Sequence, residues 1–129
     1  MMSYSFNWSA ITSGAPYVTI SSLGIAFNSA SITRLESPQR VLVGFDEEKC
    51  AIGVRAYKNE QELTAYPFAE RVKNGWTRIG CRDFIKYLQS VSGVDFSTAR
   101  RYIAKYDATE KLLIVYVREI QETNVPEKA

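Results

Sequence analysis

Short apolar runs separated by polar turns predict a chain of short strands with helices between them. Residues 17–20, Tyr-Val-Thr-Ile, predict the first strand because β-branched and aromatic residues favour extended backbone. Asn28 is a favourable N-cap residue, and we expect a short helix over residues 29–35. Two apolar runs, 41–43 and 50–54, then flank a charged loop, which predicts a β-hairpin.

The second half of the chain repeats this order of elements. Residues 76–79 predict a strand, and residues 102–117 predict a second hairpin around a polar turn. Between them, apolar residues at i, i+1, i+4 and i+7 predict a helix through 84–91. Asp83 is the expected cap of this helix, and Gly93 its expected C-terminal stop.

This order predicts an α+β fold whose small, barrel-like sheet is built from two strand–helix–β-hairpin units. One unit of about 45 residues cannot bury both faces of its hairpin, because two-stranded ribbons are marginal alone. The alternative is one α+β domain that happens to contain two hairpins. The expected organisation is an N-terminal arm (1–16), a compact domain (17–117) with pseudo-repeats 17–57 and 76–117 joined by connector 58–75, and a polar tail (118–129). The strand residues expected inside are Val18, Ile20, Val41, Val43, Ile52, Val54, Ile79, Ile103, Leu113 and Val115.

Composition agrees with one globular domain. The chain has 129 residues, of which 46% are hydrophobic, enough for a real core. Its apolar runs are far shorter than the roughly 20 residues that a membrane-spanning helix needs, so we expect no membrane partner. The N-terminal stretch has no basic segment followed by a sustained apolar one, which favours a cytoplasmic location. Cys50 and Cys81 lie within apolar runs and are expected to be small buried residues.

Charge is concentrated in one part of the sequence. The net charge is only +2, but residues 65–111 carry nine basic and five acidic side chains. This pattern is typical either of an ordinary solvated face or of a patch that meets phosphate or an acidic partner. Tyrosines interleave with these basic residues, as in a stacking platform for single-stranded nucleic acid or at the rim of a small core.

The residues needed for common catalytic and metal sites are scarce. The chain has no histidine, which excludes Ser-His and Cys-His nucleophile pairs and zinc sites with a histidine ligand. Its glycines form no phosphate-binding motif. Asp46, Glu47 and Glu48 adjoin at a hairpin tip, where acidic residues usually form turns. We therefore expect no enzyme activity, no cofactor, no metal and no small-molecule substrate.

The order of elements resembles the AbrB-like swapped-hairpin regulators, in particular their MraZ-type members with two units in one chain. The resemblance covers about 80 residues: the strand 17–20, the helix 29–35 and the hairpin 41–54, echoed at 76–79, 84–91 and 102–117. Family members bind DNA mostly through arginines near the strand–helix junction. That junction has no basic residue in the first copy (20–24) and one in the second, Arg82. Residues 27–55 are also similar to small proteins of bacterial and phage genomes.

The expected function is therefore non-enzymatic binding of duplex DNA, as an AbrB-like transcriptional regulator. The second half would supply the phosphate contacts through Arg78, Arg82, Lys86, Arg100 and Arg101. The alternative is a protein-interaction or structural module of a phage or mobile element, which assembles with itself or another protein through hairpin edges.

Overall fold

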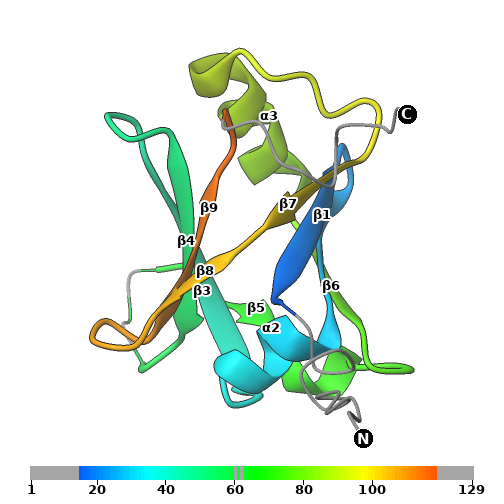
Figure 1. The fold of residues 1–129 in the computed structure, drawn as a ribbon, viewed down its shortest axis with the longest axis vertical. Helices are drawn as coiled ribbons and strands as arrows, with labels where there is room; N and C mark the ends of the chain where they lie inside the picture. The colour runs from blue at the N-terminus through cyan, green and yellow to red at the C-terminus, as the bar shows by residue number, and fades with distance from the viewer. Residues whose placement is uncertain (1–14, 60, 62, 119–129) are drawn as a thin grey trace, which may run out of the picture.

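The computed structural model describes residues 15–118 except 60 and 62, and these form an α+β fold of two antiparallel sheets with few helices (Figure 1). The proposed arm, apart from residues 15–16, and the tail beyond residue 118 lie outside the described residues. Along the chain the elements are β1 (Tyr17–Ser21), β2 (Gly24–Phe27), α2 (Ser29–Arg34), β3 (Arg40–Asp46), β4 (Ala51–Ala56), β5 (Tyr66–Pro67), the 3-10 helix η1 (Ala69–Arg71), β6 (Thr77–Gly80), α3 (Arg82–Ser92), β7 (Arg100–Ile103), β8 (Lys105–Asp107) and β9 (Leu112–Tyr116).

Sheet A has the strand order β6-β2-β1-β7. The two central strands, β1 and β2, form a tight hairpin in which Ser21 pairs with Gly24. The sequence pattern did not predict this hairpin, because the serines and Gly24 suggested an interruption of one strand. β6 and β7 come from much later in the chain and flank the hairpin on its two sides.

Sheet B has the order β5-β3-β4-β9-β8 and contains the first predicted hairpin as β3 and β4. Of the hairpin predicted over 102–117 it contains β8 and β9, whereas residues 102–103 belong to β7 of sheet A. Only Ala104 separates β7, an edge strand of sheet A, from β8, an edge strand of sheet B. Figure 1 shows this stretch running on from one sheet into the other. Ala104 is buried, and its N–H donates to the carbonyl of Pro16 at 2.9 Å.

One hydrophobic cluster contains residues of both sheets and of α2 and α3. Eight of the ten strand residues expected inside are buried, and Val43 packs against the cluster half-buried. The prediction for Ile103 is wrong. β7 pairs so that Tyr102, opposite Val18, takes the inward position, and side chains alternate between the two faces of a strand. Tyr102 is 2% exposed.

The closed barrel is not observed: within the described residues the strands form two separate sheets, with β6, β7, β5 and β8 at their edges. The two-unit organisation is not confirmed either. Two strands, β1 and β2, precede the helix of the first half where β6 alone precedes that of the second, and the second half divides one hairpin arm between two sheets. None of the helices in this part of the chain is long and apolar enough to cross a bilayer.

The ends of the helices follow local signals with one exception. Asn28 caps α2 as predicted, and Gly93 ends α3 in the left-handed conformation, with φ of 76°. α3 starts at Arg82, after Cys81 rather than after Asp83. The reason is that the Ile85 N–H donates to the Cys81 carbonyl at 3.0 Å, so the first helical hydrogen bond already encloses Asp83 in the first turn.

Candidate nucleic-acid interface

The outer face of sheet A, turned away from the core, carries two of the five basic residues predicted to bind DNA. In the paired rows of the sheet, Arg78 lies beside Ala26, Ala26 beside Thr19, and Thr19 beside Arg101. Directly paired residues point to the same face, so both arginines project outward, and both are exposed. Three strand spacings separate them, about 14 Å. Two arginines distant in sequence therefore frame a surface of small side chains.

Aromatic rings adjoin this row and hold one of the arginines. The Arg101 guanidinium carbon lies 4.6 Å from the centroid of the Tyr17 ring. Tyr17 in turn meets Trp76 edge to face, with ring centroids 5.9 Å apart, and Trp76 remains 38% exposed. A guanidinium over an aromatic face is attracted by the ring and loses conformational freedom. The arrangement pre-orients Arg101 for a planar or anionic partner.

Arg82 and Lys86 lie on α3, directly after β6. They are four residues apart, so they are neighbours on one side of the helix, and both are exposed. Asp83 lies in the same first turn. The two residues therefore form a second basic pair next to the end of sheet A at which Gly24 pairs with Gly80.

Arg100 does not share the outer face with Arg101, because successive strand residues alternate. Its Nε donates to the Asp95 carbonyl at 2.8 Å. The pKa of the Asp95 carboxyl is lowered mainly by hydrogen bonds from Ser97, backbone first, and less by the Arg100 charge. Both arginines still line a hollow of about 540 Å³, together with Thr98 and Ala99.

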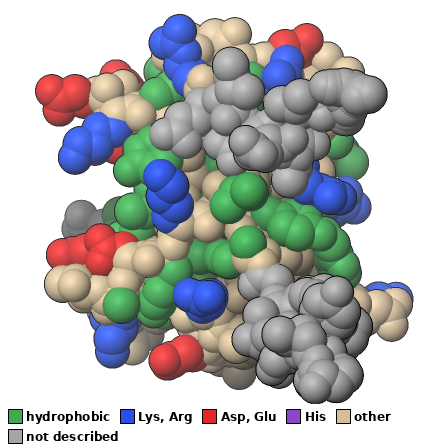
Figure 2. Space-filling model, in the orientation of Figure 1, with side chains coloured by type: hydrophobic (Ala, Val, Ile, Leu, Met, Phe, Trp, Pro, Cys, Tyr) green, Lys and Arg blue, Asp and Glu red, His purple; other side chains and the backbone are tan. Residues whose placement is uncertain are grey.

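On the face of the molecule that Figure 2 shows, the lysine and arginine side chains stand as separate groups among hydrophobic ones.

The acidic hairpin tip has structural partners. Asp46 Oδ1 accepts the Lys49 N–H at 3.1 Å, and Glu47 accepts the Tyr87 hydroxyl at 2.8 Å. Within residues 15–118 as described, no three cysteine or acidic side chains gather closely enough to hold a metal ion.

The two cysteines differ from each other. Cys81 is buried as predicted, but Cys50 is half-buried because it lies in the β3–β4 turn with φ of 53° rather than in the strand. Both thiols are free. Burial raises the pKa of Cys81 to about 11, partly offset by a hydrogen bond with the Ile25 backbone.

We expect iodoacetamide to label Cys50 at least tenfold faster than Cys81 in the native protein. At pH 8 a thiol of pKa about 11 is only about 0.1% thiolate, the reactive form. Mass spectrometry of the two peptides after timed labelling measures the ratio, and labelling in denaturant should abolish it. Equal native labelling rates at the two cysteines would contradict the expectation.

Because folding raises the pKa of Cys81 from 9.0, the contribution of its thiol to stability is complete below pH 9 and declines up to about pH 11.

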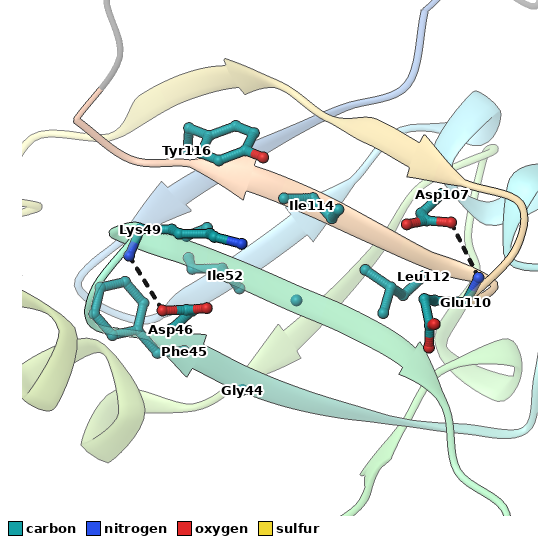
Figure 3. A pocket seen from close by; sticks show the side chains of 12 residues that line it. Gly44, Phe45, Asp46, Lys49, Ile52, Asp107, Glu110, Leu112, Ile114 and Tyr116 are labelled. Carbon is teal, nitrogen blue, oxygen red and sulfur yellow. Dashed lines mark hydrogen bonds between the residues drawn. The ribbon is translucent and has the colours of Figure 1, made fainter.

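Sequence reasoning missed a hollow on the outer face of sheet B. It has a volume of about 500 Å³ and adjoins a second one of about 410 Å³, and the two share Gly44, Gly53 and Leu112 in their linings. Figure 3 shows Leu112, Ile114 and Tyr116 spaced along β9 beside it. Two glycines in mid-strand were the available signal, because glycine in a strand often marks close approach of another molecule.

Neither a protein-family model, a curated protein nor a solved structure matches the chain.

Proposed function

We propose that the protein binds duplex DNA without catalysis, through the outer face of sheet A and the adjoining end of α3. The observation that carries the proposal is the row in which Arg78 and Arg101 flank Ala26 and Thr19. Their separation of about 14 Å is close to the roughly 12 Å width of the B-DNA major groove. Small side chains between them let the sheet approach, while each arginine reaches a phosphate strand.

Arg82 and Lys86 supply two further phosphate contacts on the α3 side. Four neutralised phosphates give a slope of log affinity against log salt of about −3.6. Tyr17 contributes by holding Arg101, and Trp76 packs against Tyr17, so less side-chain entropy is lost when Arg101 binds.

The regulator class of this proposal is AbrB-like, with a cytoplasmic location. It is supported by how the two halves of the chain meet: β2 pairs with β6, and each of these strands leads into a helix. In addition, segments 40–56 and 101–117 align without a gap at an offset of 61 residues, which matches Arg40 with Arg101 and Asp46 with Asp107. The same offset equates Gly53 with Ile114, and these two residues pair directly. Equivalent segments that pair with each other are expected of two units joined about a two-fold axis.

The test is fluorescence anisotropy with random-sequence duplex DNA at several salt concentrations. We expect binding at low salt with a slope of about −3.6, and a loss of about a hundredfold in Arg78→Glu/Arg101→Glu. The matched control, Lys49→Glu/Lys111→Glu, makes the same change in net charge on the hairpin tips of sheet B. It should weaken binding by no more than about threefold, through long-range electrostatics only.

No detectable affinity at low salt, or equal losses in the two double variants, would overturn this function. The second candidate is a protein-interaction module, which the hollow on sheet B favours. Light scattering that shows self-association without DNA binding would select it.

A further inference from the structure

The outer face of sheet B has a groove that the fold itself does not require. Gly44 and Gly53 lie directly opposite each other on β3 and β4. A Cβ at Gly44 would meet nothing within 4 Å, and one at Gly53 only the end of the Leu112 side chain, at 4.0 Å. Glycine weakens a strand, and neither position has a positive φ. The missing side chains are therefore best explained by something that lies in the groove.

A ridge runs parallel to this groove, one strand away. Leu112, Ile114 and Tyr116 project outward from β9, and all three are half-buried. Ile114 pairs with Gly53, so the middle of the ridge adjoins the glycine pair of the groove. Figure 3 shows the three ridge side chains along the strand beside the groove.

We propose that two copies of the chain pack sheet B against sheet B as a symmetric dimer. Rotation by 180° about an axis parallel to the strands, between β4 and β9, places the ridge of each copy over the groove of the other. Gly53 then faces the partner's Ile114, and Ile114 faces the partner's Gly53. A patch that carries its own complement is what a two-fold interface needs, and aligned packing of two sheets about 10 Å apart is common.

Charges on the two sides of the axis agree with this arrangement. The same rotation brings β3 opposite the partner's β8. Asp46 ends β3, and Lys105 lies on β8 in the row next to it, held 5.1 Å from the centroid of the Tyr116 ring. Opposite charges therefore lie one outward row apart across the dimer, once on each side of the axis.

The interface is small. The outward face of β3, β4, β9 and β8, taken over three rows of paired residues, covers about 300 Å² per copy. This contact area is below the roughly 800 Å² per partner of a standard stable complex. The dimer is accordingly weak and forms at high protein concentration.

Sedimentation velocity from about 10 µM to about 1 mM tests the dimer. We expect the wild type to pass from monomer to dimer, and Gly53→Val to stay monomeric because its side chain fills the groove. Gly80→Val is the matched control: it also adds a side chain where nothing lies within 4 Å, but on the outer face of sheet A, and should dimerise like the wild type. Ile114→Glu should also stay monomeric, since it removes the ridge.

A wild type that remains monomeric throughout this range, or a Gly53→Val variant that still dimerises, overturns the proposal. Far-ultraviolet circular dichroism of each variant verifies its fold. The outcome is independent of the proposed DNA binding, because Gly53→Val leaves Arg78 and Arg101 unchanged and should retain wild-type DNA affinity.

Discussion

Replacing Gly24 with alanine should lower the free energy of unfolding by about 3 kcal/mol or more. A Cβ at this position would lie 1.8 Å from the Ile79 carbonyl oxygen and 2.9 Å from its carbonyl carbon. Both are backbone atoms, so no side-chain rotation relieves the overlap, and β2 would have to separate from β6. Since both strands carry core residues, that movement disturbs Ile25 and Ile79 as well. Urea denaturation followed by circular dichroism measures the change.

Gly80→Ala is the matched control for this substitution. Gly80 pairs with Gly24 in the same row of sheet A, but a Cβ there meets nothing within 4 Å. We expect a change within about 1 kcal/mol, because alanine loses less backbone entropy than glycine and creates no overlap. If the two variants unfolded at the same urea concentration, the close approach of β2 and β6 would be wrong.

Asn28→Ala should cost about 3 kcal/mol of stability. Asn28 is 8% exposed, and its Oδ1 accepts from the Ser31 N–H at 3.0 Å, the Ser31 hydroxyl at 2.8 Å and the Tyr17 N–H at 3.1 Å. Its Nδ2 donates to the Ala15 carbonyl at 3.1 Å. One amide thus caps α2 and ties the start of β1 to it. Loss of a cap costs about 1 kcal/mol, and each buried polar group left without a partner adds about 1 kcal/mol or more.

Asn28→Asp separates the two roles of this side chain. The carboxylate keeps the acceptors for Ser31 and Tyr17, but its second oxygen replaces the donor to Ala15 and is repelled by that carbonyl. We therefore expect a smaller loss than in Asn28→Ala, measured as the difference between the two unfolding free energies in urea at neutral pH. A larger loss in Asn28→Asp would mean that the lost bond to Ala15, together with the repulsion that replaces it, outweighs the retained acceptors.

Several elements of the fold could be predicted from the sequence because their signals are local. Asn28 begins a helix with its own side chain, and Gly93 ends one by adopting a positive φ, so both act within one turn of backbone. The hairpin of β3 and β4 follows from two apolar runs around a short charged loop. The basic character of residues 65–111 is equally a property of the sequence alone.

The arrangement of those elements depended on contacts between distant segments. β2 and β1 lie between β6 and β7, and only their register places Arg78 and Arg101 on one face while Arg100 lies on the other. The same register turns Tyr102 inward and Ile103 outward. The groove of Gly44 and Gly53 likewise becomes visible only when β9 lies beside β4. A shift of one residue reverses every side chain of a strand, and burial of the whole core, which no short segment encodes, selects the register.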